Sequence, residues 1–326
     1  MKRILPIVLA ALAVAPASAS AAEQVLAVEQ APFTADSYGG VTAWSSYDTQ
    51  TKTYRLRILR NGTPADPNVR TLRRAFDLDV GPGEDGSPVV VYSRNGEIYR
   101  YDVATAAERK VNSVSSPHWL ETQPSIHGTR IAFVRNKPGA SKQRPRPLVY
   151  VGSTSQAASK RQPTPPFKRT VSVEGVELTA RGLLVVWRSD AEPTFGSRAT
   201  LYRVKDNRLQ HIFYVGSGGA NFGRLLSPSV SGLDVYFGRT NTGSGTGNTF
   251  FRYGLGTKKL SSARGTGRAN TLTWLGDRFL MATAIGGDTC NGNINDPPEA
   301  SQCKLVITDP VTWAPASAVD QRRTRP

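Results

Sequence analysis

The sequence is poor in the residues that most metal and redox sites use. Its 326 residues include only three histidines, two cysteines and two methionines, which argues against a His-rich metal centre or an active site built on several histidines. It contains no G-x-S-x-G elbow of the kind found in α/β-hydrolases. Beyond the N-terminus, no apolar run reaches the roughly 20 residues of a membrane-spanning helix. We therefore expect a folded protein without a metal, a cofactor or a membrane span.

The first 21 residues have the pattern of an export signal. Met1-Lys2-Arg3 is a positively charged start, residues 4–15 form an apolar block, and residues 16–21 are small residues of the kind a signal peptidase accepts. We expect cleavage after Ala19 or Ala21, and a mature protein that is secreted, periplasmic or cell-wall-associated. The apolar block is too short to span a bilayer. The alternative interpretation of this segment is a buried N-terminal helix.

The two cysteines agree with export. Cys290 and Cys303 flank a polar, turn-rich stretch, and in an oxidising compartment they are predicted to form a disulfide that closes a small loop. Such a bridge stabilises a fold by about 3 kcal/mol in the loop-entropy model. The stretch also carries oxygen ligands that suit calcium, but their spacing differs from that of an EF-hand, so no metal site is predicted. These residues are Asp288, Asn291, Asn293, Asn295, Asp296 and Glu299.

A glycine followed by an apolar segment recurs six times, at intervals of 47, 42, 54, 50 and 44 residues. The glycines are Gly39, Gly86, Gly128, Gly182, Gly232 and Gly276. The third, fourth and fifth residues after each glycine are mostly apolar, so both faces of the predicted strand are apolar. A strand of this kind is covered by another layer on each side.

A second strand follows each of these segments, and Asn95-Gly96 between the pair of the second repeat is a strong hairpin signal. No repeat contains a convincing amphipathic helix. Six units of about 47 residues predict an all-β fold, a six-bladed β-propeller with four-stranded antiparallel blades over residues 22–316. Seven blades are the alternative. We expect residues 24–28 to pair with the last blade and residues 317–326 to form a flexible basic tail.

Two segments resemble the repeat of TolB-like, or WD40-like (PD40), β-propellers. One is residues 124–134, and the other is residues 85–93 followed by 98–105. The acidic residue typical of that repeat is kept at Asp85 and replaced by His127 and Ser231 in other repeats. The resemblance extends over most of residues 30–312. It implies a six-bladed exported scaffold, and it carries no universal catalytic residues to this chain.

The long connections between the first and second predicted strands should emerge on one face of the propeller, where recognition loops concentrate. One of them is basic, and its predicted binding residues are Arg135, Lys137, Lys142, Arg144 and Arg146. We expect the partner to be a protein or an anionic surface polymer, not a nucleic acid, and the chain to be a monomer. The alternative is a solvated basic surface, because 30 of the 41 basic residues are arginine.

A propeller enzyme is the alternative function, for example a lyase, a lactonase or a glycan hydrolase. Such an enzyme would need carboxylates that converge in the central channel. The candidates lie near predicted strand ends, and the sequence does not show whether they meet. They are Asp77, Asp79, Glu84, Asp85, Glu121, Glu174 and Glu177. No catalytic residue is predicted, and a binding scaffold is the favoured interpretation.

Overall fold

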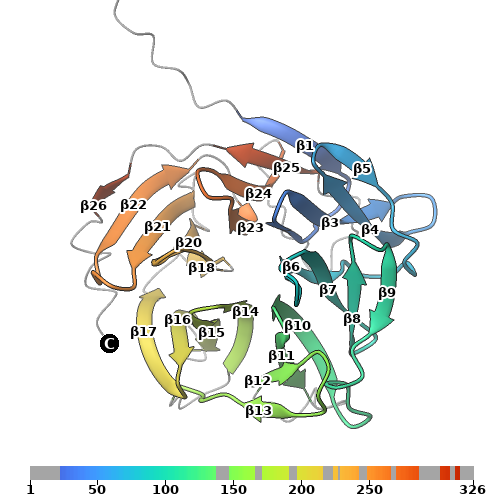
Figure 1. The fold of residues 1–326 in the computed structure, drawn as a ribbon. Coiled ribbons are helices and arrows are strands. Elements are labelled where there is room, and N and C mark those ends of the chain that lie inside the picture. The colour runs from blue at the N-terminus through green and yellow to red at the C-terminus, as the bar shows by residue number, and fades with distance from the viewer. Residues whose placement is uncertain are drawn as a thin grey trace, which may run out of the picture.

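Six sheets stand around a common axis in the computed structural model (Figure 1). The structure describes residues 23–136, 147–165, 171–190, 197–215, 223–226, 228–241, 248–265, 269–285, 302–308 and 313–315. All strand pairs in these ranges are antiparallel, and none of these ranges contains a helix. The predicted six-bladed β-propeller is therefore confirmed. Nothing in the described ranges forms a helix that is long and apolar enough to cross a membrane.

The first three blades have four strands each, in order from the axis outward. Blade 1 comprises β2 (Ala35–Tyr38), β3 (Val41–Asp48), β4 (Thr53–Arg60) and β5 (Thr63–Ala65). Blade 2 comprises β6 (Asp77–Pro82), β7 (Pro88–Arg94), β8 (Glu97–Asp102) and β9 (Ala107–Lys110). Blade 3 comprises β10 (Leu120–His127), β11 (Arg130–Asn136), β12 (Leu148–Ser153) and β13 (Ser159–Arg161).

Blade 4 follows the same plan, and blades 5 and 6 vary it. Blade 4 comprises β14 (Val171–Thr179), β15 (Gly182–Asp190), β16 (Ser197–Lys205) and β17 (Arg208–Val215). Blade 5 has an inner strand in two pieces and an added outer strand: β18 (Gly223–Leu225), β19 (Ser229–Ser231), β20 (Asp234–Asn241), β21 (Asn248–Gly254), β22 (Leu260–Gly265) and β26 (Ala314–Pro315). Blade 6 comprises β23 (Ala269–Trp274), β24 (Phe279–Ala284), β25 (Cys303–Thr308) and β1 (Gln24–Glu29).

The N-terminal strand closes the ring, as predicted. β1 pairs with β25 and so provides the outer strand of blade 6, with Val28 opposite Lys304. Blade 6 thus combines the N-terminal strand with three strands from near the other end of the described chain, which ties the first blade to the last. Unfolding of β1 must open this sheet.

The second strand of each blade is buried on both faces because it lies between two neighbouring blades. In β7, Val89, Val90, Val91 and Tyr92 are each at most 1% exposed. Val90 and Tyr92 pack with side chains of blade 1, whereas Val89 and Val91 pack with side chains of blade 3. Burying an apolar side chain of this size contributes about 1.5–3 kcal/mol. Packing between blades therefore explains the apolar pattern on both faces of the repeat.

Short polar side chains join the innermost strands of neighbouring blades. We call Asp36, Asp79, Ser125, Glu177, Ser229 and Thr273, one from each inner strand, the inner belt. In four blades, the belt side chain accepts a hydrogen bond from the next blade. The donor is the backbone N–H of the residue that directly follows the belt residue of that next blade. These bonds join Asp36 to Val80 at 2.7 Å, Asp79 to Ile126 at 3.0 Å, Ser125 to Leu178 at 2.8 Å, and Ser229 to Trp274 at 2.9 Å.

The inner belt also joins the last blade to the first. The Thr273 hydroxyl donates to Asp36 Oδ1 at 2.6 Å. The belt thus satisfies backbone donors of inner strands that have no sheet partner on the side facing the axis. It fixes which side chains of the six inner strands lie at the same height on the axis.

We predict that Ser125→Ala destabilises the fold by about 1–3 kcal/mol, because it leaves the buried N–H of Leu178 without its acceptor. Ser125 is 0% exposed, so water does not replace the lost hydroxyl. Urea denaturation measures the change in the free energy of unfolding. The matched control is Ser155→Ala on the surface, which should change that free energy by less than about 0.5 kcal/mol. Equal effects of the two substitutions would show that the belt bond contributes nothing.

Candidate functional site

A cavity of about 460 Å³ lies on the propeller axis, and all six blades contribute to its wall. Its volume falls within the usual range for small-ligand sites, about 300–1,000 Å³. The cavity is acidic, because five carboxylates line it and they come from three of the inner strands. These are Asp36 of β2, Asp77 and Asp79 of β6, and Glu174 and Glu177 of β14.

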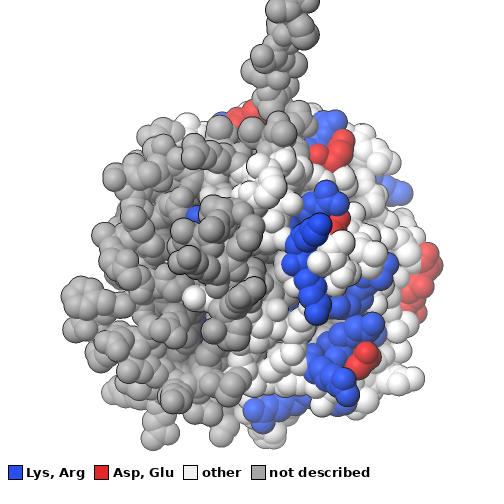
Figure 2. Space-filling model, turned by 90° about the vertical axis from the view of Figure 1, so that its left-hand side faces the viewer, with Lys and Arg blue, Asp and Glu red and all other residues white. Residues whose placement is uncertain are grey.

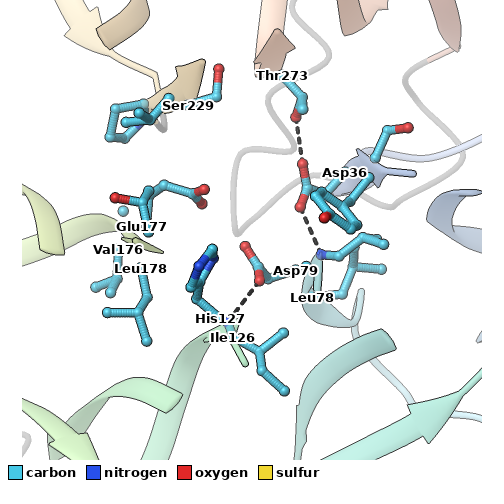
Figure 3. A pocket seen from close by; sticks show the side chains of 18 of the residues that line it. Asp36, Leu78, Asp79, Ile126, His127, Val176, Glu177, Leu178, Ser229 and Thr273 are labelled. Atoms are coloured by element: carbon cyan, nitrogen blue, oxygen red, sulfur yellow. Dashed lines mark hydrogen bonds between the residues drawn. The ribbon is translucent and has the colours of Figure 1, made fainter. Parts of the chain in front are cut away.

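Three of these carboxylates belong to the inner belt and form one cluster, which we call the acid cluster: Asp36, Asp79 and Glu177. Figure 3 shows their side chains directed into the space between the inner strands. The three acids influence one another's protonation, because their charges repel. The cluster is therefore a set of acids that resist ionising together.

Burial sets the protonation of the acid cluster. It raises the pKa of Asp36, of Asp79 and of Glu177. For Asp79, the charge of Asp36 raises the pKa further, and for Glu177 the charges of Asp79 and Asp36 do the same. Within the described part of the chain, no Lys or Arg forms an ion pair with any of the three. The cluster thus lacks the internal cation that usually accompanies buried carboxylates.

A fourth acid lies deeper in the same wall. Burial raises the pKa of Asp77 to about 6, although its Oδ2 accepts a hydrogen bond from the backbone N–H of Gln123 at 2.6 Å. His127 lines the cavity near Asp79 in Figure 3. Its pKa is lowered by burial and by the charge of Arg130. At neutral pH this histidine is therefore uncharged and does not neutralise the acids.

The cavity wall also has polar atoms that no protein group uses. Among the described residues, Trp274 Nε1 and Gln123 Oε1 have no hydrogen-bond partner. The Trp274 ring is held by stacking on Tyr236, with centroids 4.2 Å apart and planes 7° apart. Both atoms are closed off from solvent, so they are unsatisfied groups inside the wall and not groups that a ligand in the cavity would meet.

The cavity does not have the arrangement of a metal site. In the ranges that the structure describes, no group of three or more His, Cys, Asp or Glu side chains could hold a metal ion. What the arrangement can do is hold protons, accept hydrogen bonds and receive positive charge.

The structure separates the carboxylates that the sequence grouped together. Asp77, Asp79, Glu174 and Glu177 line the cavity. The other three do not line it. Glu84 and Asp85 lie in the exposed turn after β6, and Glu121 is buried inside blade 3, where its Oε1 accepts a hydrogen bond from Arg135 Nε at 3.1 Å.

Sequence reasoning missed Asp36, although a signal for it exists. Asp36, Ser125, Ser229 and Thr273 each stand three residues before a repeat glycine. All four are short side chains that can accept a hydrogen bond, and all four belong to the inner belt. Aligning the residues before the glycines, and not only those after them, would have placed Asp36 on the axis.

The predicted basic site is only partly within the described residues. Arg135 is half-buried in blade 3, where its Nη2 donates to the Val114 carbonyl at 2.8 Å and its guanidinium lies over the Tyr150 ring at 4.6 Å. Lys137, Lys142, Arg144 and Arg146 lie outside the described residues. Cys303 begins β25 and is 0% exposed, whereas Cys290 and the 288–299 loop lie outside the described residues. The basic site and the disulfide therefore stay predictions.

We predict that Glu177→Gln stabilises the protein at pH 7.5 and not at pH 4. The folded protein holds the Glu177 proton more tightly than the unfolded chain does, because burial raises its pKa. Stability is therefore lost as pH rises above the ordinary pKa of glutamate, and an uncharged side chain avoids that loss. The expected gain is roughly 0.5–2 kcal/mol, measured by urea denaturation at both pH values.

The control for this experiment is Asp277→Asn, since the Asp277 side chain is 74% exposed. This change should leave the free energy of unfolding within about 0.5 kcal/mol of the original at both pH values. A Glu177→Gln protein that is less stable at pH 7.5 would mean that the carboxylate is charged and well compensated in the fold.

No protein-family model matches the chain, and no curated protein matches it in sequence. Solved structures do resemble it. TolB from Acinetobacter baumannii is 16% identical over 85% of this chain and 67% of that chain, with a TM-score of 0.48. A chain of the mitotic checkpoint complex is 11% identical over 94% of this chain and 98% of that one, with a TM-score of 0.51.

An oligogalacturonate lyase in complex with manganese is 8% identical over 83% of this chain and 86% of that chain, with a TM-score of 0.45. The neighbours thus include both TolB and a lyase. At these identities the likeness concerns the fold and not the activity. The fold of the chain is a six-bladed β-propeller.

Proposed function

We propose that the chain is an exported, non-catalytic β-propeller that binds a partner protein by receiving a cationic group in its axial cavity. The observation that carries this proposal is the acid cluster, Asp36, Asp79 and Glu177, which is buried together on three blades without an internal cation. The cationic group is the ammonium or guanidinium of a side chain, or an N-terminal amine.

Electrostatics give the cluster its affinity for positive charge. The three acids keep protons because burial disfavours their charged form and because their charges repel one another. A cation that enters the cavity offsets both effects, so the acids ionise and form charge-assisted hydrogen bonds to it. Binding then releases protons, and the energy of the new ion pairs exceeds that of exposed pairs because the surrounding protein lowers the effective dielectric constant.

The cavity also has the form of a site for a side chain. It has a volume of about 460 Å³, which holds a long basic side chain with a few of its neighbours. Tyr38, Pro82, His127 and Gly232 line it close to the turns of the inner hairpins. Apolar and aromatic atoms in the wall accommodate the methylene stem of Lys or Arg while its charged end meets the acids.

Export is supported by the N-terminal pattern and by the position of the first strand. The predicted signal segment ends at residue 21, and β1 begins at Gln24. This strand is used in closing the ring, so the mature chain would begin within two or three residues of its first structural contact. The partner would then be met at the cell surface or outside the cell. The basic residues Arg135, Lys137, Lys142, Arg144 and Arg146 stay a proposed second contact.

One observation favours catalysis as the second candidate. Asp79 and Glu177 line one cavity and both have a raised pKa, as one member of the carboxyl pair of an acid–base enzyme does. Glycosidases, however, keep the other carboxyl group ionised as a nucleophile or base. Here burial raises the pKa of both groups. The electrostatics therefore support binding better than glycan hydrolysis.

We predict that N-acetylated Lys-Lys-Lys binds the protein and that N-acetylated Gly-Gly-Gly does not, because only the first carries a cationic group. Isothermal titration calorimetry in two buffers of different ionisation enthalpy should show proton release on binding. Glu177→Gln and Asp79→Asn should each weaken binding tenfold or more, the effect expected from losing one buried charge partner. Asp277→Asn, which removes an exposed charge, should change the affinity less than about twofold.

Two results would contradict the proposal. One is equal binding of the two tripeptides, and the other is unchanged affinity in both cavity variants. A catalytic role would be indicated if the protein cleaved an oligosaccharide or a peptide and if Glu177→Gln abolished that turnover.

A further inference from the structure

A second hollow lies between blades 3 and 4, and its charge is opposite to that of the axial cavity. We call it the basic crevice. It has a volume of about 300 Å³, and four cationic side chains line it together with a single carboxylate, Asp206. The four cations are Arg130, Lys160, Arg181 and Lys205. They come from four separate elements: the start of β11, β13, the turn between β14 and β15, and the end of β16.

The four cations are not used by the fold. Within the described residues, none of their side chains forms an ion pair or a hydrogen bond, and all four are exposed. With Asp206 included, the lining carries a net charge of +3. Figure 2 shows that Lys and Arg side chains also gather in a band on one side of the ring, with few acidic residues among them. The crevice is distinctive because it is concave and draws its charges from two blades.

Neighbouring groups show that the potential at the crevice is positive. After burial, the charge of Arg130 is the second cause that lowers the pKa of His127. In the same way, burial first and Arg181 second lower the pKa of Arg203. In both cases the positive charge that lowers the pKa belongs to a residue that lines the crevice. An anion placed there would relieve this repulsion.

The backbone that carries the crevice cations is fixed before any ligand arrives. The turn at Arg181 is held because Arg203 Nε donates to the Arg181 carbonyl at 2.9 Å. The Arg181 N–H in turn donates to Thr179 Oγ1 at 3.1 Å. On the other wall, Asp206 and Asn207 form a tight turn with φ of 51° and 60°, directly after Lys205. Fixed turns lower the entropy that ligand binding must overcome.

We propose that the basic crevice binds a phosphate group, as a site separate from the axial cavity. Two guanidinium forks and two ammonium groups match the three oxygens and the double charge of a phosphate better than the single charge of one carboxylate. The turn at Ala180 and Arg181 lines both the axial cavity and the crevice. A phosphate in the crevice and a cation in the cavity would therefore lie on opposite sides of one turn.

The test uses inorganic tripolyphosphate as the probe and the full mature chain as the protein. Isothermal titration calorimetry at low ionic strength should detect binding to the unmodified protein. The double variant Arg130→Gln, Lys160→Gln should bind it at least tenfold more weakly. The matched control is Arg60→Gln, Lys259→Gln, which removes one exposed Arg and one exposed Lys from blades 1 and 5 and should change the affinity less than about twofold.

Two further measurements test whether the crevice prefers phosphate to carboxylate and whether it acts separately from the axial cavity. Citrate, a multiple carboxylate, should bind more weakly than tripolyphosphate, and Glu177→Gln should leave the tripolyphosphate affinity unchanged. Thermal unfolding verifies that both double variants are folded. The proposal is overturned if the two double variants lose affinity equally, because net charge would then explain the binding. It is also overturned if citrate binds as tightly as tripolyphosphate, or if the unmodified protein does not bind tripolyphosphate.

Discussion

Hydrogen bonds between the inner strands of neighbouring blades are the interaction on which the rest of the structure depends. A propeller blade satisfies its backbone groups within its own sheet, except along the edge that faces the axis. The inner belt supplies acceptors to that edge, from Asp36 to Val80 and onward around the ring. Because each acceptor must reach the next blade, the belt side chains are short, and they are held at one height in a narrow space.

This constraint explains how acids become buried on the axis. Serine and aspartate both accept the same backbone hydrogen bond, so the belt tolerates either residue. Ser125 and Ser229 do so without charge, whereas Asp36 and Asp79 bring a carboxyl group into the same position. Glu177 is one methylene longer than aspartate, and it lies near enough to Asp79 for the charge of Asp79 to raise its pKa. The protein lowers the energetic cost of these acids by keeping them protonated, and that arrangement is also what makes the cavity receptive to a cation.

The sequence predicted the parts of the fold that apolar packing determines. Strands such as β7 and β24 are apolar on both faces, so their pattern gave the number of blades and the pairing around the ring. The inner strands were not predicted because they are polar on the axial face and interrupted by bulges, as between Thr122 and Ser125 in β10 and between Val173 and Gly175 in β14. A bulge breaks the alternation of period two that identifies a strand.

The candidate sites were harder to predict, since they depend on which blades meet. Asp79 and Glu177 are 98 positions apart in sequence, and only ring closure brings them together. The basic residues show the opposite effect. Arg130 and Arg135 are close in sequence, yet they lie at the two ends of β11, where one lines the basic crevice and the other pairs with Glu121 inside blade 3. Neighbours in sequence are a poor guide to neighbours at a site when every strand crosses the whole blade.

Infrared difference spectroscopy of the carboxyl groups tests most directly whether the acids on the axis hold protons at neutral pH, because a protonated carboxyl absorbs apart from a carboxylate. We expect a protonated-carboxyl band at neutral pH that is weaker in Glu177→Gln and disappears when a cation occupies the axial cavity. A protein whose carboxyl groups are all ionised at neutral pH, with no change when the cation binds, would contradict the account.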